Sequence, residues 1–118
     1  MPALNFQKQF APAIRAGLRR QPGGKRQTIR GREIPEGAPL YLFTGMRTKQ
    51  CRRLGQTTCR RCRPITIHGA FVSVDGRMLD VGELIDLAND DGFADCKAMK
   101  DWFMKTHGLP FRGWLIEW

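Results

Sequence analysis

The dipeptide Asp75-Gly76 places the strongest single constraint on the fold of this chain. It follows the apolar run 71–74, and an Asp-Gly pair after such a run favours the left-handed backbone of a tight β-hairpin turn. Residues 57–67 alternate loosely between apolar and polar side chains, as a half-buried strand does. The middle of the chain therefore predicts two or three antiparallel strands.

Two helices are expected after these strands. Asp80 and Glu83 have the spacing of a capping box, and the helix behind them is expected to end near Gly92. A second helix is expected to begin at Asp95 and to end at Gly108. Its buried face is predicted to hold Cys96, Met99, Trp102 and Phe103.

The N-terminal half gives weaker signals. The spacing of apolar residues predicts a short helix over residues 11–16, with Gly17 as its stop, and then a basic loop over residues 18–31. A buried strand is expected at residues 41–44, followed by an exposed connection or a short helical turn over residues 45–55.

The chain is expected to close on a strand, residues 113–118, with Trp114, Ile116 and Trp118 on one face. Strands outnumber helices and the helices come late, so we expect an α+β fold with a partly closed barrel and short flanking helices. Residues 1–118 are expected to form a single domain.

Charge is divided unevenly along the chain. Residues 1–63 hold 15 Lys and Arg residues against two acids, whereas residues 64–118 hold five against nine. A cationic face of this kind attracts phosphate-bearing ligands and releases their counterions, so nucleic acid is the expected partner class. The alternative is a basic surface that only keeps the protein soluble, and the basic residues do not alternate with an apolar face as membrane-binding helices require.

Two segments, Ile14-Arg15-Ala16-Gly17 and Lys25-Arg26-Gln27-Thr28-Ile29-Arg30, carry a resemblance to the ASCH-domain family. In that family a glycine closing the first helix precedes a Lys-x-x-Thr-x-Arg element that enters a PUA-like β-barrel. Residues 40–45, 88–93 and 102–118 extend the resemblance over most of the chain. Residues 18–24 depart from it, because the family commonly joins the glycine directly to the Lys-x-x-Thr element.

The resemblance implies candidate catalytic residues. In the acetylcytidine amidohydrolase branch, that lysine and threonine act with an acid on the later helix, so the roles fall on Lys25, Thr28 and Asp91, where the branch carries glutamate. A threonine hydroxyl needs a base, and lysine is one only if burial or a second cation such as Arg26 or Arg30 lowers its pKa. In an extended segment Lys25 and Thr28 would point to opposite faces, so their pairing requires a bend.

A second set of residues suits RNA binding without catalysis. Cations around the cleft are expected to contact phosphates, and either Tyr41 or Trp114 is the candidate for stacking on a base. The expected phosphate contacts are Arg26, Arg30, Arg47, Lys49, Arg52 and Arg53.

Three functions follow as hypotheses: a binding module for RNA or a modified nucleoside, a hydrolase acting on a modified pyrimidine nucleoside, and a ribonuclease, an activity also associated with some ASCH proteins. We expect no cofactor and no membrane partner. We also expect a monomer or weak dimer, located in the cytoplasm of a bacterium or, for a phage-encoded protein, of its host.

The cysteines give a zinc alternative that the sequence does not favour. Cys59 and Cys62 have the spacing of one ligand pair, with Cys51, Cys96 or His68 left to complete a site. A second such pair is missing from the sequence, and three nearby arginines would repel a cation. Isolated thiols and no bound metal are expected.

Overall fold

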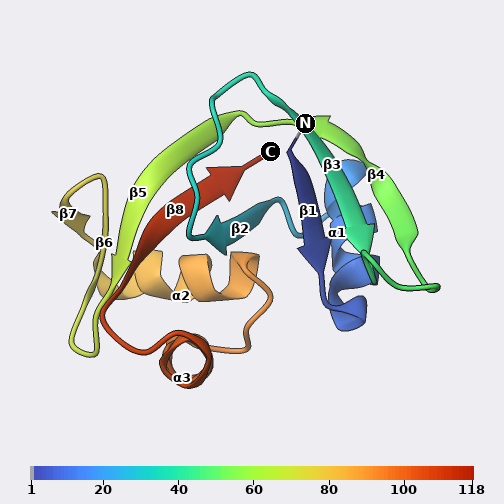
Figure 1. The fold of residues 1–118 in the computed structure, drawn as a ribbon. Coiled ribbons are helices and arrows are strands. Elements are labelled where there is room, and N and C mark those ends of the chain that lie inside the picture. Colours follow the sequence, from blue (N-terminus) through green and yellow to red (C-terminus); the bar gives the residue numbers. More distant parts are fainter. Residues whose placement is uncertain (1) are drawn as a thin grey trace.

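The computed structural model describes residues 2–118 and has an α+β fold of two β-sheets with helices packed beside them (Figure 1). The helices are the 3-10 turn η1 (Lys8–Phe10), α1 (Ala11–Leu18), α2 (Val81–Asp90) and α3 (Cys96–Thr106). The strands are β1 (Ala3–Phe6), β2 (Gln27–Arg30), β3 (Pro39–Thr44), β4 (Arg52–Thr58), β5 (Arg61–Ile67), β6 (Val72–Val74), β7 (Arg77–Met78) and β8 (Phe111–Glu117). None of the helices in residues 2–118 is long and apolar enough to cross a membrane.

The smaller sheet has the strand order β1-β3-β4, with β1 parallel to β3 and β4 antiparallel to it. Leu40 and Leu42 on the central strand β3 are fully buried, because side chains two residues apart share one face of a strand. Helix α1 packs on β4. A Cβ atom at Gly55 would lie 2.6 Å from Leu18 Cδ1, so the glycine lets the helix approach the strand.

The larger sheet is antiparallel, with the strand order β2-β8-β5-β6-β7. Alternation along β8 divides its side chains between two cores. Leu115 packs with Met99 and Phe103 in a core beneath α2 and α3, whereas Ile116 and Trp118 pack in the core shared with the smaller sheet. Figure 1 shows α2 and α3 together on one side of this sheet.

Strands β1 and β2 are edge strands of the two sheets and face one another across an opening (Figure 1). Over residues 2–118 the two strands share no ladder, and the sheets do not close into a barrel. One side chain spans the opening, because Arg30 Nη2 donates a hydrogen bond to the carbonyl oxygen of Asn5 at 2.8 Å. This opening positions the candidate site.

Local signals in the second half of the chain predicted its elements well. Asp75 and Gly76 have φ angles of 54° and 76°, which confirms the left-handed hairpin turn between β6 and β7. Asp80 and Glu83 form both hydrogen bonds of the capping box, and Asp95 caps α3 through Ala98 N. The predicted face of the last strand is also confirmed, with Trp114, Ile116 and Trp118 in one core.

Four expectations for the chain need correction. The basic loop expected over residues 18–31 contains strand β2 (Gln27–Arg30), whose first three residues are buried. Gly17 does not stop α1, which runs to Leu18, but allows a close backbone contact described below. Residues 52–55, expected in an exposed connection, belong to strand β4 (Arg52–Thr58), whose side chains face mostly outward and so lack an apolar period. Trp102, expected in the core, is 38% exposed, and β1 was not predicted.

Candidate functional site

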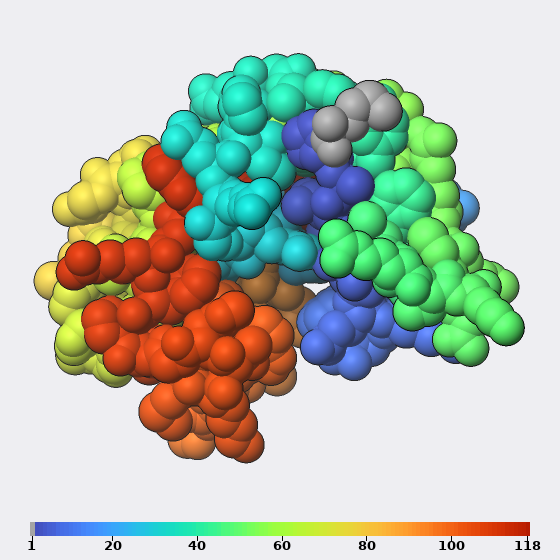
Figure 2. All heavy atoms as spheres, in the orientation of Figure 1, coloured from blue at the N-terminus to red at the C-terminus, as the bar shows by residue number. Residues whose placement is uncertain are grey.

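A cavity of about 300 Å³ lies in the opening between β1 and β2. Figure 2 shows this face hollowed between the blue N-terminal segment and the orange-red region of α3. Its polar side chains include Lys25, Thr28, Arg30 and Asp91, and most of its remaining wall is aromatic. We call it the aromatic cavity, after the rings of Phe6, Phe10, Phe93, Trp102, Phe103, His107 and Phe111 that line it.

Backbone contacts with α1 fix the position of Lys25. Lys25 N donates to the carbonyl oxygen of Ala13 at 2.7 Å, and a Cβ atom on Gly17 would lie only 2.0 Å from Lys25 O. Gly24 is equally constrained, since its Cβ would lie 2.3 Å from Gly17 N. The two glycines therefore let the chain ahead of β2 lie directly on the helix, and the Lys25 side chain enters the cavity.

The Lys25 amine is 4% exposed and forms a buried ion pair with Asp91. Nζ lies 3.2 Å from Asp91 Oδ1 and 2.9 Å from the Asp91 carbonyl oxygen, and 5.3 Å from the centre of the Phe10 ring. Burial lowers the pKa of Lys25 because the charged form loses hydration, while the attraction of Asp91 opposes the shift.

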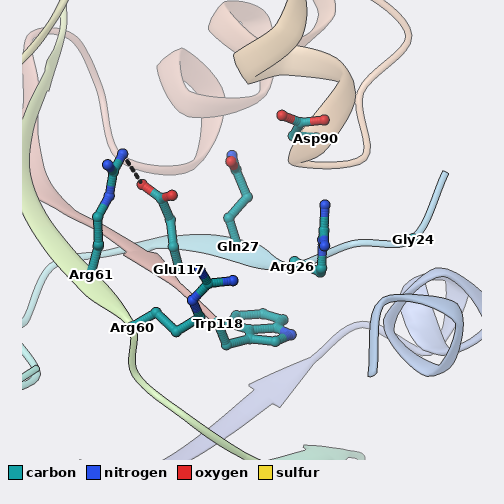
Figure 3. A pocket seen from close by; sticks show the side chains of 8 residues that line it. All are labelled: Gly24, Arg26, Gln27, Arg60, Arg61, Asp90, Glu117 and Trp118. Atoms are coloured by element: carbon teal, nitrogen blue, oxygen red, sulfur yellow. Dashed lines mark ion pairs between the residues drawn. The ribbon is translucent and has the colours of Figure 1, made fainter. Parts of the chain in front are cut away.

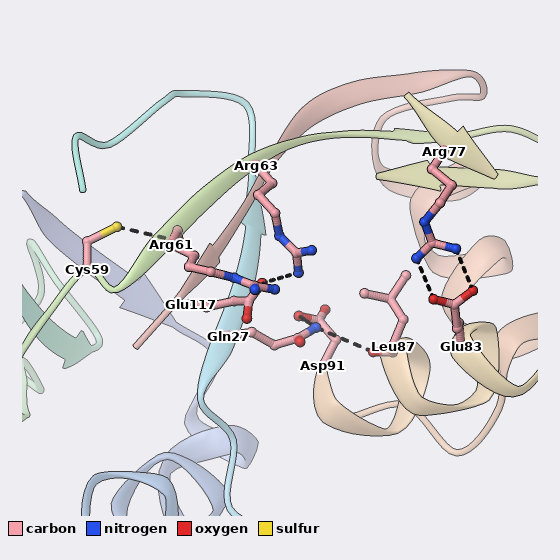
Figure 4. A network of polar contacts seen from close by, with 9 residues as sticks. All are labelled: Gln27, Cys59, Arg61, Arg63, Arg77, Glu83, Leu87, Asp91 and Glu117. Atoms are coloured by element: carbon pink, nitrogen blue, oxygen red, sulfur yellow. Dashed lines mark hydrogen bonds and ion pairs between the residues drawn. The ribbon is translucent and has the colours of Figure 1, made fainter. Parts of the chain in front are cut away.

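Asp91 is the C-terminal cap of α2, and the chain turns away at Gly92 with φ of 95°. Burial raises the pKa of the Asp91 carboxyl, and Lys25 and Gln27 oppose that shift. Gln27 Nε2 lies 3.4 Å from Asp91 Oδ1 and 3.4 Å from the Leu87 carbonyl oxygen (Figure 4). The carboxylate is thus held by Lys25, just ahead of β2, and by Gln27, the first residue of that strand.

Thr28 and Arg30 face the cavity from β2 itself. The Thr28 hydroxyl accepts a hydrogen bond from Arg30 Nε at 2.9 Å, so its own proton remains available to another acceptor. The Arg30 guanidinium lies 4.8 Å from the centre of the Phe6 ring, and burial lowers its pKa. Lys25 lies ahead of the strand, which begins at Gln27, so strict alternation does not govern its direction and it lines the same cavity as Thr28.

The other predicted nucleic-acid contacts lie elsewhere. Arg26 lines a different hollow, and Arg47, Lys49, Arg52 and Arg53 lie on β4 or in the turn before it, outside the aromatic cavity. Tyr41 on β3 also lies outside, with the Arg53 guanidinium 5.4 Å from the centre of its ring. Trp114 packs against the core shared by the sheets.

Sequence reasoning missed the aromatic wall of the cavity. Trp102 contacts Phe93 and Phe103 at ring-centre distances of 6.0 Å and 4.9 Å, and His107 lies 5.8 Å away. A signal was present, since aromatic residues are concentrated between residues 93 and 111. Their assignment to the core by helical spacing hid the fact that Trp102 lies at the margin of the buried face.

The described residues give no metal centre. In residues 2–118 no three His, Cys, Asp or Glu side chains are grouped closely enough to hold an ion. Cys59 is buried and its Sγ faces the carbonyl oxygens of Ile34 and Arg61, and burial raises its pKa to about 11. Such a thiol is a poor metal ligand and a poor nucleophile at neutral pH.

A buried amine, a carboxyl, a hydroxyl and a guanidinium meet here in a cavity walled by aromatic rings. This combination can hold a flat polar ring by stacking and hydrogen bonds, and it can move a proton between neighbouring groups. Comparisons with protein-family models, with curated proteins and with solved structures each returned no match.

Proposed function

We propose that this chain is an ASCH-domain protein of the PUA-like group that binds a nucleobase in the aromatic cavity, from RNA or from a modified nucleoside. The observation that carries the proposal is the buried Lys25–Asp91 pair beside an aromatic wall. Buried charges are costly, and perturbed pKa values in a cavity are typical of functional sites.

The arrangement of the sheets supports the PUA-like part of the proposal. One edge strand from each sheet, β1 and β2, borders the same opening, and Arg30 bridges it to Asn5. The two sheets also share one core, which includes Leu42 of β3 and Ile116 of β8. A barrel left open at one seam, with the ligand cavity at that seam, accounts for these features.

The cavity suits a nucleobase in size and chemistry. A volume of about 300 Å³ is at the small end of ligand pockets, which is appropriate for a single ring with its substituents. Trp102 is the proposed stacking surface, since it lines the cavity and remains 38% exposed. Lys25, Asp91 and Arg30 supply donors and acceptors for the polar edge of the base.

Hydrolysis of an acetylated cytidine is a second candidate, and one observation favours it: Thr28 and a lysine of lowered pKa line the same cavity. As a neutral amine, Lys25 has two N–H groups for Asp91 and one lone pair to accept the Thr28 proton. Thr28 Oγ1 would then bond to the acyl carbon, the C–N bond would break, and the cytidine amine would leave with a proton. Water would release acetate from the threonine ester.

The test is titration of the protein with cytidine, acetylcytidine and single-stranded RNA, followed by chromatography of each mixture. Trp102→Ala should weaken binding by about 1–3 kcal/mol, the usual value for a lost base stack. Met104→Ala is the matched control, because Met104 is exposed on the same helix and does not line the cavity. Equal affinities of the two variants would remove base stacking in this cavity from the proposal.

Chromatography separates the candidate activities. Release of cytidine from acetylcytidine by the wild-type protein, but not by the Thr28→Val variant, would identify the hydrolase. RNA fragments would identify a ribonuclease instead. Binding without any product leaves the binding module as the function.

A further inference from the structure

A second hollow, of about 340 Å³, lies beside the start of β2 and shares no lining residue with the aromatic cavity. Its polar lining includes Arg26, Gln27, Arg60, Arg61, Asp90 and Glu117, and we call it the arginine hollow (Figure 3). Three adjacent chain segments meet here. Trp118 N donates to the Arg26 carbonyl oxygen at 2.9 Å, and Arg60 N donates to that of Glu117 at 2.8 Å.

The strand register explains why charged side chains gather at this point. Gln27, Glu117 and Arg61 are direct cross-strand partners on β2, β8 and β5. Arg63 lies two residues along β5 on the same face, so the Glu117 carboxylate is held by both Arg61 and Arg63. Glu117 therefore presents little free negative charge to the hollow.

Two guanidinium groups beside the hollow are not paired with Glu117. Within residues 2–118, neither Arg26 nor Arg60 has a carboxylate within ion-pair distance. Asp90 is the remaining acid of the hollow, and the Arg26 side chain points toward it in Figure 3. Arg20 adds a further cation nearby, through a 3.1 Å hydrogen bond to the Trp118 carbonyl oxygen. The hollow is thus net positive.

The ligand chemistry follows from these groups. Guanidinium forks match the oxygens of a phosphate in planar, two-pronged geometry, and they remain charged at every physiological pH. Consecutive residues connect the two hollows, since Arg26 and Gln27 line one while Lys25 and Thr28 line the other. Neighbouring residues of one short segment therefore border both hollows.

We propose that the arginine hollow binds a phosphate group of the ligand whose base enters the aromatic cavity, so that the ligand is a nucleotide or nucleic-acid strand. This inference rests on the proposed function and adds a binding site for the charged part of the ligand, its phosphate. Asp90 opposes the phosphate, and its removal strengthens binding.

The test uses a labelled single-stranded RNA oligonucleotide, a nucleoside 5′-monophosphate and the free nucleoside, each titrated at several salt concentrations. The variants Arg26→Gln and Arg60→Gln each change one exposed residue and leave the cores intact. Each should weaken oligonucleotide binding about ten- to a hundredfold, the usual loss for a hydrogen bond to a charged group. Each should also reduce the slope of log K against log salt by about 0.7, the value of one lost contact to single-stranded nucleic acid.

Arg77→Gln is the control for net charge, because Arg77 lies on β7, three strands away from β8 in the same sheet. Asp90→Asn should tighten binding. If the arginine variants weaken the binding of both the monophosphate and the oligonucleotide, the bound phosphate belongs to the same nucleotide as the base. If they weaken the binding of the oligonucleotide alone, the phosphate belongs to a neighbouring nucleotide. Either result supports the proposal.

The proposal is overturned if Arg26→Gln and Arg60→Gln bind the oligonucleotide and the monophosphate as the Arg77→Gln control does. It is equally overturned if the wild-type protein binds only the free nucleoside. In both cases the effect of Trp102→Ala on nucleoside binding still decides the proposed function separately.

Discussion

Helix α2 carries an ion pair at each end, and the two pairs have opposite physical character. Figure 4 shows the pair at the N-terminal end, between Arg77 and Glu83. At the N-terminal end, Glu83 pairs with Arg77 through oxygen–nitrogen distances of 2.5 Å and 2.9 Å on an exposed surface. At the C-terminal end, Asp91 pairs with Lys25, and both side chains are nearly inaccessible to water. Burial is the main difference between the two ends.

The carboxyl pKa values shift in opposite directions. The hydrogen bonds of Arg77 lower the pKa of Glu83 to about 2, whereas burial raises the pKa of Asp91. The helix dipole adds to the contrast, because it favours a carboxylate in the first turn of a helix and disfavours one in the last. Glu83 therefore stabilises its end of the helix. Asp91 is unfavourable in two respects, because it is buried and because it lies at the negative end of the helix dipole.

This difference distinguishes an element of structure from a candidate site. Exposed pairs and caps each add a little to the stability of a helix. A buried ion pair generally costs stability relative to a well-packed apolar pair, so it is retained where the charges themselves have a use. The C-terminal end of α2 fits the second description.

The largest effect is expected from breaking the buried pair. Lys25→Met leaves an uncompensated carboxylate in the interior and should lower the free energy of unfolding by about 3–5 kcal/mol. The double variant Lys25→Met/Asp91→Leu should recover that loss or exceed the wild-type stability by about 1–4 kcal/mol. Urea denaturation at pH 7 measures both.

The pH dependence provides the control. In Lys25→Met the raised pKa of Asp91 rises further, because burial remains and the opposing cation is gone. The native state then keeps a proton that the unfolded chain has lost, so stability falls as pH rises above about 4, the carboxyl pKa of the unfolded chain. The double variant lacks this dependence, and equal stability of the single and double variants at pH 7 would contradict the account.

A second comparison uses the two glycines at the ends of α2. Gly92 has φ of 95°, and a Cβ there would lie 2.7 Å from Phe10 Cε1 in the cavity wall, so Gly92→Ala should cost about 1–3 kcal/mol. Gly82→Ala in the first turn meets only Asp80 Oδ1 at 3.4 Å and should stabilise the protein by about 0.5–1 kcal/mol. Thermal unfolding of the pair measures the contrast, and effects of the same sign would refute it.

The smallest effect is expected at the exposed pair. Arg77→Gln removes the hydrogen bonds that lower the Glu83 pKa, which should rise from about 2 toward its ordinary value. The lowered pKa gives Glu83 a stabilising contribution that is present above its unfolded pKa and lost as pH falls. The variant should therefore lose only slight stability at pH 7 and show a flatter dependence between pH 5 and 2. An NMR titration of Glu83 that stays unshifted would contradict this assignment.

Sequence patterns predicted the elements whose signals are local. The hairpin at Asp75, the capping box at Asp80 and the faces of β8 depend on residues within a few positions of one another. The first part of strand β4 escaped prediction because its side chains face mostly outward, and β1 was missed because it has only four residues. Such strands are specified by their hydrogen-bonded neighbours in the sheet.

The sequence predicted only part of the candidate site. The motif pointed to Lys25, Thr28 and Asp91, and the structure places all three in the wall of one cavity. Trp102 was assigned to the core because it follows Met99 by one helical turn. Met99 and Phe103 are the buried positions, and Trp102 lies at the edge of their face, where it meets the cavity.

The sequence alone determined the hairpin, the helix caps and the division of charge, because each depends on short-range backbone preference or on composition. Tertiary structure decided that Lys25 and Asp91, 66 residues apart, share a buried site, and that Arg26 and Arg60 border a separate hollow. The physical reason is that burial is a property of the assembled chain. Desolvation, which shifts the pKa of both partners in the Lys25–Asp91 pair, cannot be read from residue types before the sheets are in place.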